Sequence, residues 1–105
     1  MISSEDFTKI ELRIGKIILA ERVPNSDKLV RLLVSLGDED HQIVAGIGKA
    51  YKPEILLGKE VVIVANLEPR EIMGFQSRGM LLAASDELPV LLIPEKEVPP
   101  GATIR

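Results

Sequence analysis

One segment of fifteen residues, Asn66 to Met80, concentrates side chains that could do binding chemistry. It carries two amides, a hydroxyl and two guanidinium groups, on Asn66, Gln76, Ser77, Arg70 and Arg78. Amides donate and accept hydrogen bonds, and guanidinium groups bind phosphate through paired N–H donors, so this set can bind a nucleic acid. Glu68 and Glu71 weaken the positive charge of the segment. A structural alternative stays open, in which Asn66 and Ser77 hydrogen-bond the backbone and Met80 fills the core.

Apolar runs on both sides of this segment indicate the elements that position it. Residues 61–65 (VVIVA) and 80–84 (MLLAA) are typical of buried strands. A connection between paired strands needs only about 2 to 5 residues, and longer loops on rigid scaffolds often bind ligands. The pattern therefore predicts a binding loop presented by a barrel or sheet.

The rest of the chain alternates short strands with turn formers. The expected elements are a helix from Ser3 to about Ile10, a long bent strand at 12–20, strands at 29–36, 43–45 and 90–93, and a short helix opened by Pro53 and closed by Gly58. Five main strands with a helix between the third and fourth predict an all-β OB-fold, a five-stranded Greek-key barrel with short helices and extra C-terminal strands. An SH3-like barrel is the alternative. The length of 105 residues predicts one domain, 1–105.

Composition indicates an ordinary globular protein, with 46% hydrophobic and 28% charged residues. The longest uncharged stretch has eight residues, far below the roughly 18 of a membrane span, so no membrane partner is expected. The N-terminus lacks the pattern of a signal peptide, which predicts a cytoplasmic location.

The formal net charge of −3 argues against general electrostatic binding of nucleic acids. The charge is uneven, however, because residues 9–36 hold six basic and three acidic side chains. Sequence alone does not say whether those basic groups share one face.

No catalytic or metal-binding constellation is present, and no cofactor is expected. The chain has no cysteine and one histidine, His41, which beside an acidic turn is interpreted as a solvated hairpin residue. The three aromatic residues are too few for stacking successive unpaired bases. A nucleic-acid role would then rest on contacts to the backbone of a folded RNA recognised by shape, with one splayed base in a pocket as a further element.

Four motifs together resemble a known family: DFTKIELRIGKI at 6–17, PNSDKL at 24–29, IVAGI at 43–47 and NLEPREIMGFQSRGMLLAA at 66–84. They are similar to the tRNA-binding module found as the C-terminal domain or separate small subunit of methionyl-tRNA synthetases. The resemblance implies a non-catalytic OB-fold that forms homodimers, binds tRNA by structure and raises the tRNA affinity of the catalytic part of the synthetase.

The resemblance also implies site residues. The RNA-facing positions fall on Arg13, Lys28, Asn66, Ser77, Arg78 and Met80, with Arg70 as a phosphate contact. The dimer contact falls on Phe7, Pro89 and Leu91. Many members have Ser where Ala45 stands and basic residues where Glu68 and Glu71 stand, which predicts a less positive RNA face.

Two alternatives remain. A related dimeric chaperone-like protein associated with bacterial export shares the fold and the first motif, although the NLEP and SRGM elements at 66–69 and 77–80 favour the synthetase type. A purely structural dimerisation domain is the other.

Overall fold

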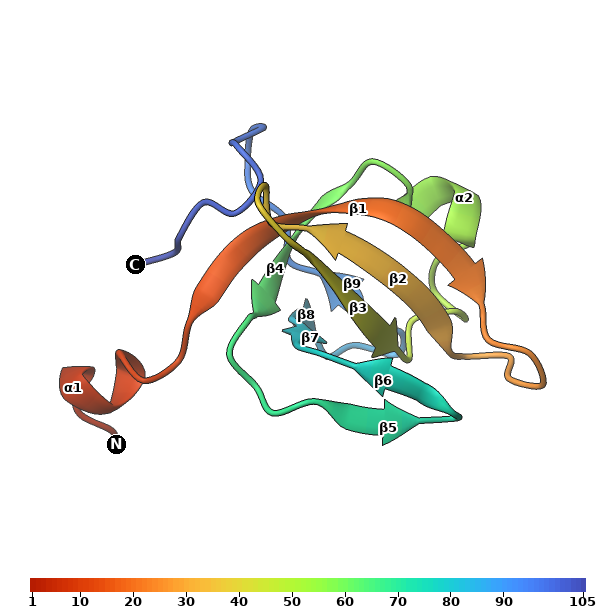
Figure 1. The fold of residues 1–105 in the computed structure, drawn as a ribbon, viewed down its shortest axis with the longest axis horizontal. Coiled ribbons are helices and arrows are strands. Elements are labelled where there is room, and N and C mark those ends of the chain that lie inside the picture. Colours follow the sequence, from red (N-terminus) through yellow and green to blue (C-terminus); the bar gives the residue numbers. More distant parts are fainter.

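Five antiparallel strands curl into a nearly closed barrel. The computed structural model describes all 105 residues. One sheet has the order β3-β2-β1-β4-β7 and consists of β1 (Leu12–Arg22), β2 (Val30–Ser35), β3 (Asp40–Ala45), β4 (Glu60–Val64) and β7 (Met80–Leu81). Strand β7 returns to contact β3 and so brings the two edges together (Figure 1). The predicted all-β barrel is confirmed, and helix α2 (Pro53–Leu56) lies between β3 and β4 as an OB-fold requires.

The core fills this barrel with alternating strand residues. In β2 the side chains of Val30, Leu32 and Val34 are fully buried, and the residues between them are half-buried. Helix α2 adds Leu56, which is also fully buried. Burying such a side chain stabilises the fold by about 1.5 to 3 kcal/mol, so the period-two pattern is the main determinant of the barrel.

Strand β1 is long and bent, as predicted, and it pairs with both β2 and β4. Its register against β2 shifts between Ile17 and Leu19, which is the mark of a β-bulge. Gly15 lets the two strands approach closely, because an added Cβ would lie 2.2 Å from Val34 Cγ1. The curvature therefore comes from a bulge together with a glycine.

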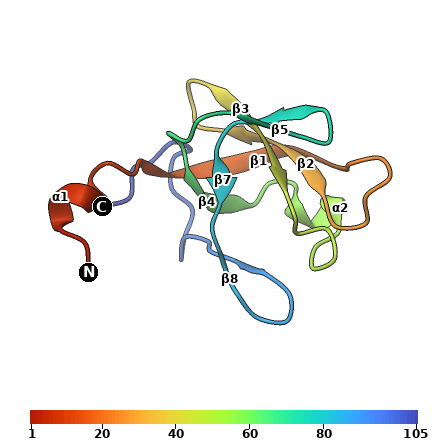
Figure 2. The same ribbon diagram turned by 90° about the horizontal axis from the view of Figure 1, so that it is seen from below.

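The segment from Asn66 to Met80 is more ordered than the predicted loop. It contains a hairpin of β5 (Arg70–Ile72) and β6 (Phe75–Ser77), which turns through Met73 and Gly74 with φ of 51° and 85°. Positive φ at both central residues gives the twist that two-residue hairpins favour. Glycine signals such a turn, but methionine seldom adopts it, so the sequence did not reveal the hairpin. Both ribbon views place the hairpin beside β3 (Figures 1 and 2).

The run at 80–84, expected as one strand, is divided. Strand β7 pairs with β4, whereas β8 (Ala83–Ala84) pairs with β9 (Val90–Leu91). The chain thus leaves the barrel sheet at Leu82 and begins a small second hairpin that includes the predicted extra C-terminal strand.

Helix α1 (Ser4–Phe7) projects from the barrel, near the C-terminus (Figure 2). The hydroxyl of Ser3 caps it by accepting a hydrogen bond from the Asp6 amide at 3.0 Å. None of its residues is buried. Both helices, α1 and α2, have four residues, so neither could span a membrane.

Candidate functional site

A cavity of about 540 Å³ opens beside the C-terminal end of β3, and we call it the β3-end pocket. Its walls come from the β1–β2 connection (Lys28, Leu29), the end of β3 and the residues after it (44–47), the segment before the hairpin (Leu67, Glu68) and the start of β7. Nine of the fifteen lining residues are hydrophobic, so the floor is apolar and the polar groups are few. OB-folds bind their ligands on this part of the barrel, between the first and the fourth interstrand loops.

Four of the seven predicted RNA-facing residues line this pocket: Lys28, Arg70, Ser77 and Met80. Lys28 and Arg70 are exposed, and neither side chain makes a hydrogen bond or ion pair within the chain. Met80 is 49% exposed and so does not fill the core. Two free cations therefore flank an apolar cavity, which suits a ligand with a negative backbone and an apolar part.

The side chains of Ser77 and Asn66 are engaged by the backbone. Ser77 is buried, and its hydroxyl oxygen accepts a hydrogen bond from the Val44 amide at 3.0 Å. Asn66 accepts from the Glu11 amide at 3.0 Å and donates to the Lys9 carbonyl oxygen at 2.8 Å. The structural alternative raised for both residues thus describes their geometry, and their contact with RNA stays a prediction.

The remaining two predicted residues lie near the other end of β3. We call this group, made of Arg13, Glu39, His41 and Arg78, the hairpin-end cluster. His41 Nε2 lies 2.8 Å from Glu39 Oε1, and this hydrogen bond, aided by the positive charges of Arg78 and Arg13, lowers the pKa of Glu39. Arg13 also donates from Nε to the Gly101 carbonyl oxygen at 3.0 Å. Arg13 is therefore engaged by the backbone. Arg78 is exposed and its side chain makes no hydrogen bond or ion pair, but its positive charge acts on the carboxylate of Glu39.

The interpretation of His41 as a solvated residue is wrong, because the side chain is only 2% exposed. Strand β3 begins at Asp40, earlier than predicted, and strand alternation then turns His41 inward together with Ile43. Since an ionised carboxylate can only accept hydrogen bonds, His41 Nε2 carries the hydrogen that is donated to Glu39. The second ring nitrogen, Nδ1, is buried without a hydrogen-bond partner.

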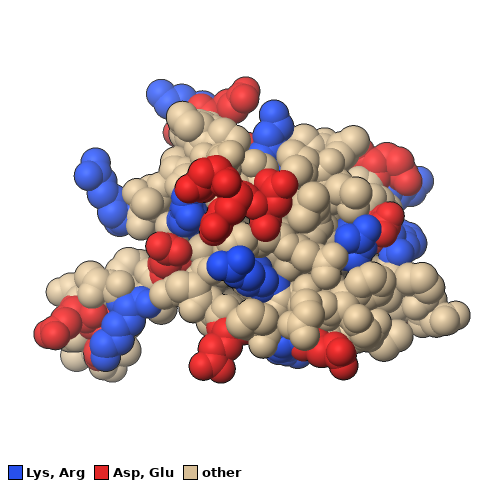
Figure 3. All heavy atoms as spheres, viewed as in Figure 1, with Lys and Arg blue, Asp and Glu red and all other residues tan.

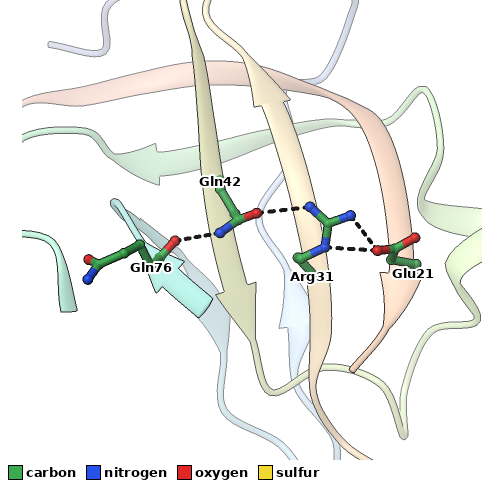
Figure 4. A network of polar contacts seen from close by, with 4 residues as sticks. All are labelled: Glu21, Arg31, Gln42 and Gln76. Atoms are coloured by element: carbon green, nitrogen blue, oxygen red, sulfur yellow. Dashed lines mark hydrogen bonds and ion pairs between the residues drawn. The ribbon is translucent and has the colours of Figure 1, made fainter. Parts of the chain in front are cut away.

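A polar network that sequence reasoning missed fixes the β5–β6 hairpin on the barrel (Figure 4). Arg31 donates from Nε to Glu21 and from a terminal nitrogen to Gln42 Oε1, each at 2.9 Å. Gln42 in turn donates to the Gln76 carbonyl oxygen at 2.8 Å. Arg31 also lies over the ring of Phe75, 5.7 Å from its centre. These contacts cross β1, β2, β3 and β6, so they hold the hairpin that borders the pocket.

The surface charge is mixed rather than gathered. Figure 3 shows basic and acidic side chains intermingled on the face that carries β2 and β3, with no continuous basic field. No group of three or more His, Cys, Asp and Glu residues is placed to hold a metal ion. Binding of a polyanion would therefore depend on a few well-placed cations.

The three residues implied for a dimer contact differ in exposure. Phe7 is 43% exposed and Pro89 is half-buried. Leu91 is only 7% exposed, because its side chain belongs to the barrel core. Its neighbours Val90 and Leu92 are 49% and 43% exposed, so they present the apolar surface of this strand.

Comparison with known proteins gives close matches along the whole chain. Residues 12–103 match the model of the family described as "Putative tRNA binding domain". Methionine–tRNA ligases of Methanothrix thermoacetophila and Thermococcus kodakarensis are 56% identical over 106 residues and 55% identical over 105 residues. The matches cover 100% and 99% of this chain but only 16% and 14% of those ligases, so the chain spans about one sixth of the relatives' length.

Two solved structures are similar over the full length. The MetRS-related protein of Pyrococcus horikoshii has a TM-score of 0.94 at 34% identity, covering 100% of this chain and 98% of that one. The chaperone CsaA of Bacillus anthracis has a TM-score of 0.92 at 35% identity, covering 100% and 99%. The fold is thus shared between proteins with two different names.

Proposed function

The chain belongs to the tRNA-binding domain family, and from that premise we propose that it binds folded tRNA at the β3-end pocket. The observation that carries the proposal is the pair Lys28 and Arg70, two exposed cations without intramolecular partners on the rim of one apolar cavity. Arg13, Arg78, Asn66, Ser77 and Met80 are proposed as further RNA contacts or as residues that shape the contact surface.

Recognition is proposed to depend on the shape of the RNA. None of the three aromatic residues, Phe7, Tyr51 and Phe75, lines the pocket. Stacking of successive bases therefore has no platform, whereas phosphate and 2′-hydroxyl contacts need only the exposed polar side chains. This mode predicts that a folded tRNA binds better than an unstructured strand.

In a longer synthetase, the domain is proposed to raise the tRNA affinity of the catalytic part. The relatives named methionine–tRNA ligase are about six times longer than this chain, which leaves room for a catalytic part outside the matched region. Linking two binding modules makes the second contact intramolecular and strengthens overall binding without new contacts. The domain itself contributes no catalytic step in this proposal, and its place of action is the cytoplasm.

The direct test is binding of the purified chain to a folded tRNA, an unstructured RNA of equal length and duplex DNA across a salt series. Preference for the folded tRNA, with affinity that falls as salt rises, is the expected result. Equal binding to all three, or no binding, would contradict structure-selective recognition.

We also propose a homodimer that forms through exposed apolar residues. Phe7 on α1 is one contact, and Val90 and Leu92 beside the half-buried Pro89 form another, with Leu91 supporting them from the core. Sedimentation of the wild type and of Phe7→Asp and Val90→Asp variants tests this: both changes should yield monomer, and a dimer that survives both would contradict the assignment.

Chaperone activity is the second candidate function, because two chains titled CsaA superpose with TM-scores of 0.92 and 0.91 at 35% and 30% identity. The discriminating measurement is the aggregation of a chemically unfolded protein in the presence of the purified chain. Suppression of aggregation without tRNA binding would favour the chaperone, and tRNA binding without suppression would favour the synthetase module.

A further inference from the structure

The β3-end pocket has a feature that phosphate binding alone does not explain. Glu68 is the one carboxylate among its lining residues, and it stands near two cations, Lys28 and Arg70. A carboxylate at this position weakens attraction to phosphate, so a purely electrostatic site would be better without it. Glu68 is exposed and its side chain makes no hydrogen bond or ion pair within the chain, so both carboxylate oxygens are available to a ligand group that donates hydrogen bonds.

We propose that the pocket holds one unpaired guanine base of the bound tRNA, with the attached phosphate against Lys28 and Arg70 and the base edge against Glu68. The inference rests on the proposed tRNA binding and names the part of the RNA that this pocket receives.

Size and floor suit a base. The volume of about 540 Å³ lies within the range of about 300 to 1,000 Å³ that is usual for small-molecule pockets. Bases taken out of a helix are held between aromatic or apolar side chains. Leu67, Met80 and Leu81 supply such apolar surfaces here, with Leu67 43% and Met80 49% exposed, and the Met80 thioether is a favourable contact for an aromatic ring.

The choice of guanine follows from hydrogen-bond chemistry. An ionised carboxylate accepts through two oxygens and donates nothing. Guanine has two neighbouring donors on its Watson–Crick edge, the N1–H and the 2-amino group, which match both oxygens at once. Adenine and cytosine place an acceptor beside their amino group, and uracil places carbonyl oxygens on both sides of its N–H, so each would set an acceptor against the carboxylate.

A size series at Gly46 tests whether the pocket is occupied. Gly46 lines the pocket, and a Cβ added there would meet no heavy atom within 4 Å, so the backbone accepts a side chain. Gly46→Ala and Gly46→Leu remove the same glycine, but only leucine fills much of the cavity. We expect tRNA affinity about tenfold weaker for Gly46→Leu than for Gly46→Ala, the effect of losing one bound base. Equal affinities in the two variants would overturn the proposal and leave tRNA binding itself intact.

Base choice is tested with nucleotides as probes. The amide signals of Ala45, Gly46 and Leu81 in the 15N-labelled chain are followed during titration with 5′-GMP, AMP, CMP and UMP, and with inorganic phosphate as the control. We expect GMP to bind at least fivefold more tightly than the others, and Glu68→Gln, which has the same shape, to lose that preference.

The outcomes separate this inference from the broader function. Equal shifts with all four nucleotides, or shifts with phosphate alone, would overturn the guanine assignment even if tRNA binds. If the wild type binds GMP at these amides but no tRNA, the proposed function fails while the base pocket stands.

Discussion

Basic side chains lie near both ends of strand β3, but their neighbours within the protein differ. At the C-terminal end, Lys28 and Arg70 border an apolar pocket and have no partner within the chain. At the N-terminal end, Arg13 binds a backbone carbonyl oxygen and, with Arg78, lies near the carboxylate of Glu39. The six residues of β3 separate these ends by about 17 to 20 Å. Lys28 and Arg70 are therefore more available to a polyanion than Arg13, whose guanidinium group is already engaged by the protein.

The comparison also explains how a chain with net charge −3 could bind RNA. Mixed charge covers the face seen in Figure 3, so long-range attraction of a polyanion is weak. Two cations that share one pocket then give a local contact whose strength depends on salt. Four experiments test this contrast.

The largest effect is expected from removing both free cations. Lys28→Ala combined with Arg70→Ala should weaken tRNA binding about hundredfold near 0.1 M salt and flatten the salt dependence by about two units of slope, one for each lost phosphate contact. A fluorescence anisotropy titration at several salt concentrations measures both quantities. The matched control is Lys52→Ala, which removes an exposed lysine outside the pocket and should change little. Similar losses in control and double variant would show that net charge, rather than the pocket, governs binding.

The next effect concerns the support beneath the pocket. Ser77→Ala leaves the buried Val44 amide without its acceptor, which costs about 1 to 3 kcal/mol. For a domain of this size that corresponds to a melting temperature lower by about 4 to 8 °C for each kcal/mol. Thermal unfolding followed by circular dichroism measures the change.

Ser35→Ala is the control for this stability effect, because its hydroxyl accepts from an exposed amide, that of Gly37. It should lower the melting temperature much less. If Ser77→Ala melted like the wild type and yet lost tRNA binding, the serine would be a direct RNA contact rather than a support.

A smaller effect is expected at the hairpin-end cluster. Glu39→Gln removes the negative charge that offsets Arg13 and Arg78, so both arginines become more available to phosphate. We expect tRNA affinity to rise about twofold to fivefold, as for other exposed charge pairs, with a steeper salt dependence. Unchanged affinity would place this cluster outside the RNA contact.

The smallest effect is on stability at low pH. The pKa of Glu39 lies below its usual value of 4.5 in the folded chain, chiefly because of the hydrogen bond with His41. A carboxyl group with a lowered folded pKa contributes stability that is present above pH 4.5 and is lost as pH falls through the folded value. Urea midpoints measured from pH 7 down to pH 3 should therefore fall less steeply for Glu39→Gln than for the wild type. Parallel curves would contradict the assignment.

Local patterns predicted the barrel because they act within a few residues. Alternation in β2, the turn formers at 24–27 and the proline that opens α2 each fix one element, and their order is sufficient for the five-stranded arrangement. The hairpin was missed because its turn uses a methionine with positive φ, a conformation that sequence does not signal. The burial of His41 was not predicted because the expected strand began at residue 43, whereas β3 begins at Asp40. His41 was therefore assigned to the turn instead of to the inward-facing side of the strand.

The surroundings of the predicted site residues could not be read from the sequence, for a different reason. Residue types identified Arg70 and Arg78 as candidate phosphate contacts, and the family resemblance added Lys28 and Arg13. The availability of these side chains depends on partners that are distant in sequence. Arg13 is held by a carbonyl oxygen 88 residues away, and no local pattern contains that contact. The distinction between free and engaged cations thus appears only in the folded chain.

Amide chemical shifts of the 15N-labelled chain, followed during titration with a folded tRNA, locate the RNA contact on the barrel. We expect the largest shifts or broadening around the β3-end pocket, at Lys28, Gly46, Arg70 and Met80, with little change in α2. Changes concentrated instead on α1 and β9, with the pocket unaffected, would contradict this expectation.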